Sequence, residues 1–187
     1  VKAGEAFDVH AAGMLALDVA RIEAGLLLID VDFNNAKRAQ IEAQKYTPYE
    51  MGLGRLVSKD KARFVGQSAL ADERRRGHAR EIVGLELDWG GIEAVYERSG
   101  LPPAMPATAS RAAVPVYSGG KQVGKATSTT WSPVLKKMIA LATIDRGYFE
   151  VGTRLEMEMT VEAVRHRVPA EVVKTPFFNP PRKMQTP

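Results

Sequence analysis

The sequence contains no cysteine among its 187 residues. This absence excludes disulfides, thiolate metal sites and cysteine nucleophiles, and it is compatible with the cytoplasmic location that we expect. His10, His78 and His166 are far apart and lack partners at ligand spacing, so no metal site is predicted. The sequence also lacks a serine–histidine–aspartate pattern, a phosphate-binding glycine loop and a dinucleotide fingerprint. These common classes of catalytic site are therefore not indicated.

Long hydrophobic runs are also missing. A membrane-spanning helix needs about 18 or more apolar residues, and the longest run, residues 24–31, is short and contains Asp30. We therefore expect no membrane partner. Val1 is not a start methionine, and the residues after it do not form a secretion signal. We interpret the chain as a processed product or as part of a longer protein.

The formal net charge is +4, and the positive charge is spread along the chain with short runs at residues 74–76 and 136–137. No zinc-finger, aromatic RNA-stacking or basic-zipper pattern accompanies it. We interpret these runs as solvated surface and expect no nucleic acid, with an anionic partner as the alternative. A hydrophobic share of 45% with 26% charged residues is ordinary for a globular protein.

Four segments within residues 1–77 carry helix signals. Apolar residues recur at spacings of four, three and four: Leu15, Val19, Ile22 and Leu26. Asp18 and Arg21 lie on another face of that helix and can pair. The stretch from Asn34 or Asn35 to Gln44 predicts a second helix. Residues 47–50 have the pattern of a capping box, and residues 67–76 predict a helix that Gly77 ends.

After about residue 81 the hydrophobic period changes to two. Residues 153–161 alternate most clearly, and four side chains are predicted to face inward: Leu155, Met157, Met159 and Val161. Further strands are predicted at residues 82–88, 114–117, 122–127, 138–144 and 167–174, with a hairpin turn at Gly119 and Gly120. Residues 89–111 are rich in glycine and proline and predict a long loop, with one helical turn near 94–99. The fold class is therefore α+β, with a small antiparallel barrel or sandwich after the helices.

One block resembles a known family. Residues 127–133 read TSTTWSP, preceded by VPVYSGGKQVG at 114–124 and followed by MIALA at 138–142. This order resembles the C-terminal barrel of the glycine cleavage T-protein (aminomethyltransferase) superfamily, with its "PVY-DG-EVG", "TSGTFSP" and "IALA" patterns. Four collinear segments are also similar: residues 13–25 to "GLAARDTLRLEAG", 46–54 to "TPLEAGLG", 64–70 to "FIGREAL" and 171–178 to "VVKLPF".

The resemblance implies transfer of one-carbon units to tetrahydrofolate. It implies that residues 1–77 are the C-terminal part of a folate-binding lobe and that residues 78–187 form the small antiparallel β-barrel that closes over it. The expected partners are folate, a small one-carbon donor and the missing N-terminal half of the same protein. The family's key aspartate and pterin-associated glutamate belong to that missing half, so no catalytic residue is expected in this chain.

Several departures indicate a divergent member of the superfamily. Leu17 stands where the family helix has its first arginine, and Arg21 matches the second. Residues 29–32 replace a "YG-E" pattern and are followed by an inserted stretch at 37–45, while Thr129 replaces the glycine of "TSGTFSP".

Three residues are predicted by the resemblance to bind the cofactor: Arg21, Trp131 and Arg182. Arginine's planar fork suits a carboxylate, although Arg21 can instead clamp Asp18 or a neighbouring loop. Trp131 either packs in the barrel or offers a stacking wall to folate. Arg182, with Lys183, is either a loose basic tail or reaches the glutamate end of the cofactor.

Three acidic residues receive a structural interpretation. Glu23 lies roughly 160° from Arg21 on the helical wheel, so the two cannot line one small pocket. Asp30 and Asp32 have the spacing for general acid–base work on one strand face, but we interpret them as solvated loop carboxylates.

The leading hypothesis is therefore the C-terminal part of a tetrahydrofolate-dependent one-carbon transferase. One alternative is a non-catalytic folate-binding or scaffold protein, like the superfamily members that serve iron–sulfur assembly. Those members carry a cysteine motif, which this chain lacks. Another alternative is a tetrahydrofolate-dependent O- or S-demethylase, which the altered residues 29–32 leave open.

Overall fold

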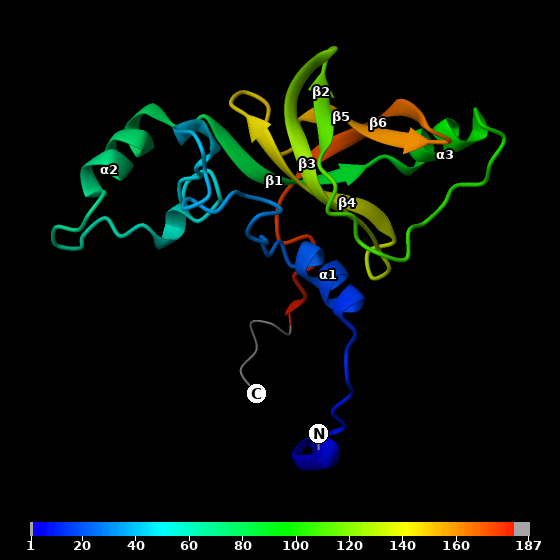
Figure 1. Cartoon of the computed structure of the whole chain (residues 1–187), viewed down its shortest axis with the longest axis horizontal. Helices are drawn as coiled ribbons and strands as arrows, with labels where there is room; N and C mark the ends of the chain where they lie inside the picture. Colours follow the sequence, from blue (N-terminus) through cyan, green and yellow to red (C-terminus); the bar gives the residue numbers. More distant parts are fainter. Residues whose placement is uncertain (1, 182–187) are drawn as a thin grey trace.

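The computed structural model describes residues 2–181 and consists of a barrel with helices around it (Figure 1). Within those residues six strands form the barrel: β1 (Arg80–Leu87), β2 (Val114–Ser118), β3 (Lys121–Ser132), β4 (Lys137–Asp145), β5 (Arg154–Val161) and β6 (Val164–Val173). They follow one another around the closed barrel in the order β1-β4-β3-β2-β5-β6. All neighbours are antiparallel, and β1 closes the ring by pairing with both β4 and β6. The predicted α+β class with a small antiparallel barrel is confirmed.

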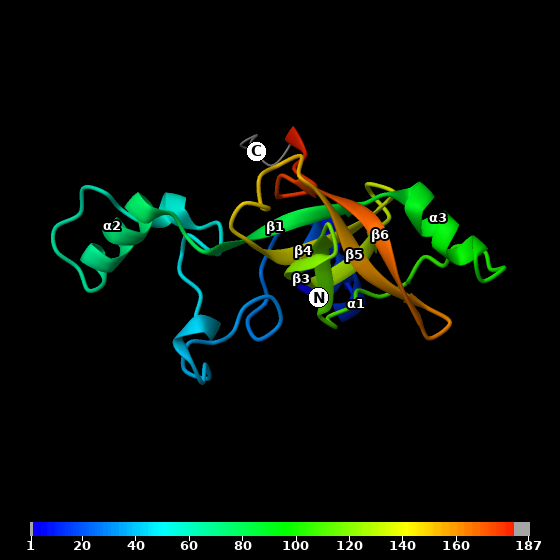
Figure 2. The same ribbon diagram turned by 90° about the horizontal axis from the view of Figure 1, so that it is seen from above.

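The helices occupy different sides of the barrel (Figures 1 and 2). They are α1 (Met14–Glu23), α2 (Gln67–Arg76) and α3 (Trp89–Glu97), with 3-10 turns η1 (Lys2–Phe7), η2 (Glu42–Gln44) and η3 (Gly54–Leu56). α1 packs on the outside of β3 and β4, and α3 lies beside β6 at one end of the barrel. α2 stands away from the strands with the loops that precede it. α2 and its termination at Gly77, where φ is +76°, were both predicted.

The barrel interior follows the predicted alternation on β5. Leu155, Met157 and Val161 are buried and Met159 is partly buried against the same core, which confirms the inward face. β4 differs, because its seven residues from Met138 to Ile144 are all buried. One face of β4 points into the barrel, and the other is covered at Ile139 and Leu141 by Ile22 of α1. This second cluster holds the helix against the barrel wall.

Two predicted turns have the expected chemistry. Gly119 and Gly120 have φ values of +54° and +86°, which are the left-handed angles that a tight hairpin turn requires. Thr47 and Glu50 form the predicted capping box: the Glu50 N–H donates to Thr47 Oγ1 and the Thr47 N–H donates to Glu50 Oε2, both at 3.2 Å. A turn follows in place of a helix, since Gly52 has a φ of +68°.

The helix predicted between Asn34 and Gln44 is wrong. The segment contains a turn and the short η2. Asn35 Oδ1 accepts a hydrogen bond from the Lys37 N–H at 3.0 Å, which gives the backbone a local alternative to a helix. The segment also buries no residue, so tertiary packing does not support a helix there.

The long loop predicted for residues 89–111 is wrong in its first part. α3 fills Trp89–Glu97 despite Gly90 and Gly91. Its N-cap is Asp88, whose Oδ2 accepts a 2.6 Å hydrogen bond from the Gly91 N–H. Ile92 and Val95 are buried in the barrel core, and this burial outweighs the low helix propensity of the two glycines.

Candidate functional site

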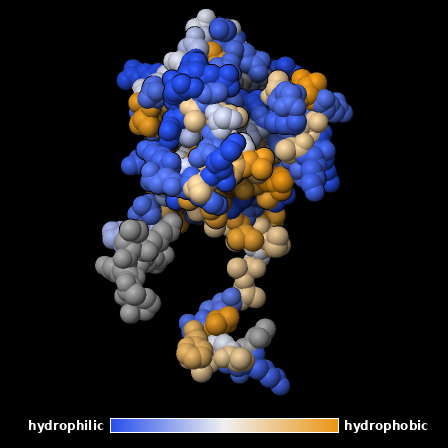
Figure 3. All heavy atoms as spheres, turned by 90° about the vertical axis from the view of Figure 1, so that its left-hand side faces the viewer, coloured by the Kyte–Doolittle hydropathy of each residue, from blue (hydrophilic) through white to orange (hydrophobic). Residues whose placement is uncertain are grey.

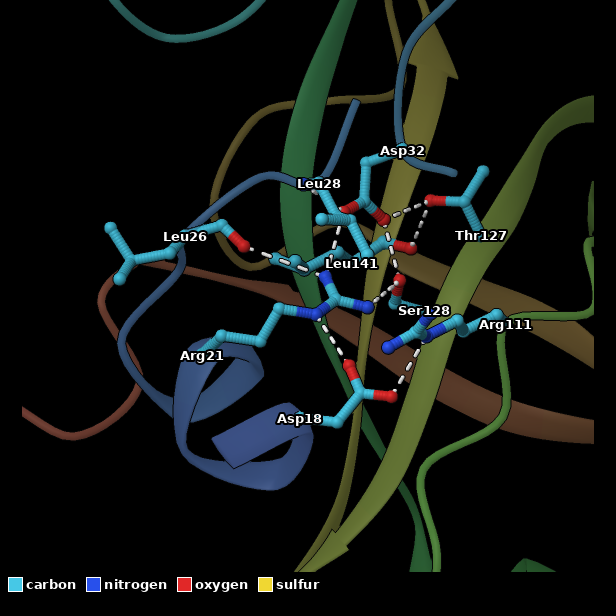
Figure 4. A network of polar contacts seen from close by, with 9 residues as sticks. All are labelled: Asp18, Arg21, Leu26, Leu28, Asp32, Arg111, Thr127, Ser128 and Leu141. Carbon is cyan, nitrogen blue, oxygen red and sulfur yellow. Dashed lines mark hydrogen bonds and ion pairs between the residues drawn. The ribbon is translucent and has the colours of Figure 1, made fainter. Parts of the chain in front are cut away.

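α1 meets the barrel wall through a buried network of polar side chains centred on Arg21 (Figure 4). Arg21 Nε donates to Asp18 Oδ1 at 2.7 Å, Nη1 to Asp32 Oδ2 at 2.8 Å and Nη2 to Ser128 Oγ at 2.8 Å. Nη1 also lies 3.5 Å from the carbonyl oxygen of Leu26. The Arg21 side chain is only 10% exposed, so its charge is stabilised chiefly by these partners.

Asp32 is the second centre of the network, and its side chain is fully shielded from solvent. Oδ2 accepts hydrogen bonds from Arg21 Nη1 and from the Leu28 N–H, both at 2.8 Å. Oδ1 accepts from Thr127 Oγ1 at 2.8 Å and from Ser128 Oγ at 2.6 Å. The interpretation of Asp32 as a solvated carboxylate is therefore wrong. For Asp30, which is exposed and pairs with Arg38, it is confirmed.

A β-bulge explains how two consecutive hydroxyls reach one carboxylate. Side chains normally alternate across a strand. In β3, however, the pairing with β4 shifts between Ala126 and Ser128, so Thr127 is an extra residue. Both Thr127 and Ser128 are buried and bond to Asp32. Bulges re-aim side chains in this way and are common beside functional sites.

Asp18 connects the network to the segment before β2. Its Oδ1 accepts from Arg21 and its Oδ2 accepts from Arg111 Nε at 2.9 Å. Burial raises the pKa of the Asp18 carboxyl, but the hydrogen bonds and positive charges of Arg21 and Arg111 outweigh burial and lower this pKa below its ordinary value. The carboxylate is therefore held in its charged form. The predicted pairing of Asp18 with Arg21 is confirmed.

Glu23 anchors the other end of α1. Its Oε1 accepts a 2.5 Å hydrogen bond from Ser132 Oγ, which in turn accepts from the Leu135 N–H at 3.1 Å. The carbonyl of Glu23 accepts from the Phe178 N–H at 2.9 Å. Glu23 thus ties the helix to the end of β3 and to the segment after β6, which agrees with its structural interpretation.

The network has little spare bonding capacity. Asp32 uses both oxygens twice, and four of the five N–H groups of Arg21 face protein acceptors. One N–H of Nη2 remains for a ligand, so a bidentate carboxylate clamp by Arg21 does not fit this arrangement. A positioning role with at most one direct hydrogen bond does fit. The cofactor-binding role of Arg21 itself stays a prediction.

The two other predicted cofactor residues lie outside this network. Trp131 is on β3, partly buried against the barrel core, and its ring centroid is 5.2 Å from that of Trp89 on α3. The two rings are tilted by 59°. The packing that we predicted as one alternative is therefore present, and stacking on folate stays a prediction. Arg182 lies outside the described residues.

Two sizeable cavities border the helical segments. One of about 730 Å³ lies between the C-terminal end of α2 and the barrel, with Glu73, Arg76, His78 and Arg146 among its lining residues. Another of about 460 Å³ lies between residues 24–27 and β6. Residues 2–181 contain no cluster of three or more histidine, aspartate or glutamate side chains arranged to hold a metal ion. In the same residues, no helix is long and apolar enough to cross a membrane.

Sequence reasoning missed Asp32, Thr127 and Ser128 as members of one site. Thr127 and Ser128 did belong to the motif that carries the family resemblance. Their contact with Asp32 spans 95 and 96 positions of sequence, which no local pattern reports.

A closed antiparallel barrel, with a helix held on its outer wall by a buried arginine–aspartate network, defines the class of domain to which this structure belongs. The sequence model of the glycine cleavage T-protein C-terminal barrel domain matches residues 80–179, and the chain belongs to this family.

The similarity to known relatives extends beyond the barrel to nearly the whole chain. An aminomethyltransferase of Thermosynechococcus vestitus is 35% identical over 178 residues, covering 95% of this chain and 40% of the relative. An aminomethyltransferase of Bacillus subtilis is 34% identical over 179 residues, covering 95% of this chain and 41% of the relative. A trimethylamine-oxide aldolase of Ruegeria pomeroyi is 34% identical over 182 residues, covering 96% of this chain and 19% of the relative. The chain therefore spans well under half the length of these relatives.

The fold has a solved counterpart. The crystal structure of the glycine cleavage system aminomethyltransferase T from Bartonella henselae superimposes with a TM-score of 0.63. The match covers 87% of this chain and 38% of that chain at 23% identity. The likeness shows that the two share a fold.

Proposed function

We propose that this chain is the C-terminal part of a tetrahydrofolate-dependent one-carbon transferase of the aminomethyltransferase type. The observation that carries the proposal is the extent of the match: the aminomethyltransferase relatives align along 95% of the chain, so they include the helical segment as well as the barrel. Residues 1–77 complete a folate-binding lobe, and residues 78–187 form the barrel that closes over it. The preceding part of the protein supplies the catalytic carboxylate.

In that proposal the residues of this chain hold structural elements and the cofactor in place. The Arg21–Asp32 pair holds α1 and residues 26–32 at a fixed place against β3, through Ser128 and Thr127. Trp131 presents a ring face to the cofactor, and Arg182 reaches its glutamate end. Tetrahydrofolate, when bound, supplies the nitrogen that accepts the one-carbon unit.

The test compares two tryptophans of one ring pair in the full-length protein. Trp131→Ala and Trp89→Ala both remove the contact between the rings, which lie 5.2 Å apart, but only Trp131 is proposed to face folate. Titration of tetrahydrofolate into each variant should show a dissociation constant about 5- to 150-fold larger for Trp131→Ala than for Trp89→Ala, at base–aromatic stacking strengths of about 1–3 kcal/mol. Equal constants for the two variants would assign Trp131 to packing alone.

The transfer reaction itself is tested by supplying tetrahydrofolate with a panel of one-carbon donors and following the folate product by mass spectrometry. The panel contains an aminomethylated carrier protein, methylated amines, methoxylated aromatics and methylsulfonium compounds. Formation of a one-carbon folate from the aminomethylated carrier protein supports the aminomethyltransferase-type transferase. Tight folate binding without turnover of any donor would favour the scaffold alternative.

A second candidate function is demethylation or C–N cleavage of a small methylated substrate. One relative is called a trimethylamine-oxide aldolase, so a region like this chain also occurs in a longer protein named for another reaction. The segment 29–32, where the family pattern is replaced, contains the buried Asp32. Turnover of a methylated amine, aromatic ether or sulfonium in the donor panel, but not of the aminomethylated carrier, would support this candidate.

A further inference from the structure

Arg111, in the segment before β2, belongs to the Arg21 network but uses little of its own bonding capacity. Its Nε donates to Asp18 Oδ2 at 2.9 Å. An arginine has five N–H donors, and within residues 2–181 no hydrogen bond involves Nη1 or Nη2 of Arg111. The side chain is 52% exposed. Four donors at the edge of the network are therefore open to a ligand.

The backbone around Arg111 is held firmly, which distinguishes it from an ordinary surface arginine. Exposed polar side chains are common in this protein, since Figure 3 shows a largely hydrophilic body on the face that carries α2. Next to Arg111, however, the Ser110 N–H donates to the Thr129 carbonyl at 2.8 Å, and the Thr129 N–H donates back at 3.0 Å. Ala109 packs against the apolar cluster that contains Ile22. This segment is thus fastened to both β3 and α1.

Asp18 fixes how the guanidinium of Arg111 lies relative to that of Arg21. Arg21 Nε is 2.7 Å from one oxygen of this carboxylate, and Arg111 Nε is 2.9 Å from the other. In Figure 4 the two arginines reach Asp18 from different elements, Arg21 from α1 and Arg111 from the segment before β2. Because the Arg111 guanidinium is already held, binding a ligand there costs less side-chain entropy than at a loose arginine.

The surroundings of Arg111 suit a charged group. The buried residues of α1 are Asp18, Arg21, Ile22 and Glu23, and three of them are charged. The apolar stripe predicted for this helix is therefore fully buried only at Ile22. α1 meets the barrel chiefly through polar contacts, so a polar ligand at this junction displaces no apolar packing.

The free donors and the charges of the network select the chemistry of the ligand. The ligand group must accept hydrogen bonds, which excludes an ammonium group. A carboxylate accepts two parallel N–H bonds from the planar end of an arginine. Arg21 and Arg111 are already balanced in charge by Asp18 and Asp32, so a singly charged carboxylate fits better than a doubly charged phosphate.

We propose that Arg111 is a carboxylate-binding residue, and that Nη1 and Nη2 hold the ligand's carboxylate in bidentate fashion while Asp18 holds Nε. This assigns to Arg111 the clamp that the bonds of Arg21 rule out for Arg21 itself. The carboxylate belongs either to the glutamate part of the cofactor or to a one-carbon donor that is an N-methylated amino acid. These two sources rest on the proposed function, whereas the carboxylate chemistry rests on the contacts of Arg111.

The first test replaces the planar end of Arg111 in the full-length protein. Arg111→Lys keeps a positive charge beside Asp18 but cannot form a bidentate pair. Arg165→Lys is the matched control, because Arg165 is also exposed and also faces a carboxylate through Nε, 3.7 Å from Glu158. Dissociation constants are measured for two pairs of ligands that differ in a carboxyl-bearing part. The pairs are tetrahydrofolate with tetrahydropteroate, which lacks the glutamate, and N-methylglycine with dimethylamine.

If the cofactor supplies the carboxylate, Arg111→Lys should weaken tetrahydrofolate binding about tenfold or more, the loss expected for one charge-assisted hydrogen bond, and leave tetrahydropteroate binding unchanged. If the donor supplies it, the same selective loss should appear for N-methylglycine and not for dimethylamine. Either result supports the carboxylate site. Equal effects within both pairs, or the same losses in Arg165→Lys, would overturn it.

A second measurement needs neither folate nor a one-carbon donor. Phenylglyoxal modifies accessible guanidinium groups, and mass spectrometry follows Arg111 and Arg165 in the same sample of the full-length protein. Glutarate, a dicarboxylate, should cause a saturable loss of Arg111 modification and leave Arg165 unchanged. No protection, protection by inorganic phosphate alone, or an Arg111 that is unreactive without glutarate would overturn the site. Protection in a protein that binds no tetrahydrofolate would refute the proposed function and leave the carboxylate site standing.

Discussion

Arg21 Nη1 lies 2.8 Å from Asp32 Oδ2, and the Asp32 side chain is completely shielded from water while that of Arg21 is 10% exposed. The pair joins α1 to the turn that follows it, and hydroxyls of β3 complete the bonds of both ions. Burying two charges is costly, so such a pair specifies an arrangement more than it adds net stability. Its consequences appear when one partner is removed.

Arg21→Met should lower the free energy of unfolding by about 3–5 kcal/mol, because the Asp32 carboxylate remains buried without its cation. Urea denaturation of the full-length protein, followed by tryptophan fluorescence, measures the change. Arg38→Met is the matched control, since Arg38 and Asp30 form a solvent-exposed pair and such pairs contribute about 0–1 kcal/mol. A similar decrease in the free energy of unfolding of the two variants would contradict the conclusion that Arg21 compensates the buried charge of Asp32.

Ser128→Ala should destabilise the protein by about 1–3 kcal/mol, because it leaves buried hydrogen-bonding groups of Arg21 and Asp32 unsatisfied. The bulge at Thr127 puts Ser128 in this position, and it is fully buried. Ser118→Ala at the end of β2 serves as the control, with an expected change within about 0.5 kcal/mol. A shift of the denaturation midpoint in the control but not in Ser128→Ala would contradict the assignment.

The pH dependence of stability should report on Asp18. Arg21 and Arg111 lower its pKa in the folded state despite the opposing effect of burial. The stabilisation is therefore fully present above the unfolded-state pKa of about 3.9, and it is lost as the pH falls through the lower folded-state pKa. Asp18→Asn should accordingly be less stable than the parent at pH 7, by a margin that narrows on acidification.

Thermal unfolding from pH 7 down to pH 3 measures that margin. Arg111→Met provides an independent check, because loss of one cation should move the acid-induced loss of stability to higher pH. If the parent and Asp18→Asn curves stayed parallel over the whole range, Asp18 would not be the responsible group.

Gly124→Ala should destabilise the barrel by about 1–3 kcal/mol, the usual cost of overpacking. A Cβ at position 124 would lie 2.3 Å from the carbonyl oxygen of Thr143 on the neighbouring strand, and backbone cannot move aside cheaply. Gly90→Ala is the control, since its Cβ would meet only Asp88 Oδ2 at 3.4 Å, within the helix α3. Circular dichroism melting temperatures compare the two. Equal melting temperatures for both variants would show that β3 and β4 can separate locally.

Much of the barrel was predictable because strand and turn signals are local. The alternation at Leu155 and Met157 survives folding, and Gly119 and Gly120 adopt the angles that only glycine adopts easily. α3 was not predictable in this way, because Gly90 and Gly91 disfavour a helix locally. The burial of Ile92 and Val95 in the barrel end reverses that preference.

The candidate site was predictable only in part. Asp18 and Arg21 are three positions apart on one helix, so their pairing follows from helix geometry. Asp32 has no such neighbour in sequence. The groups that donate hydrogen bonds to it come from α1, from its own turn and from β3. An aspartate in a loop is ordinarily solvated, and nothing in the local pattern distinguishes Asp32 from the exposed Asp30.

The sequence by itself determined the family, the strand-forming segments, the hairpin turn and the Asp18–Arg21 contact, since each depends on residues within one turn, one strand or one motif. The tertiary structure decided which carboxylate is buried, which hydroxyls reach it and which side of α1 faces the barrel. The physical reason is that burial of a charge is tolerated only where several donors converge on it. Here two of those donors, the hydroxyls of Thr127 and Ser128, come from a bulged strand more than ninety residues away in sequence.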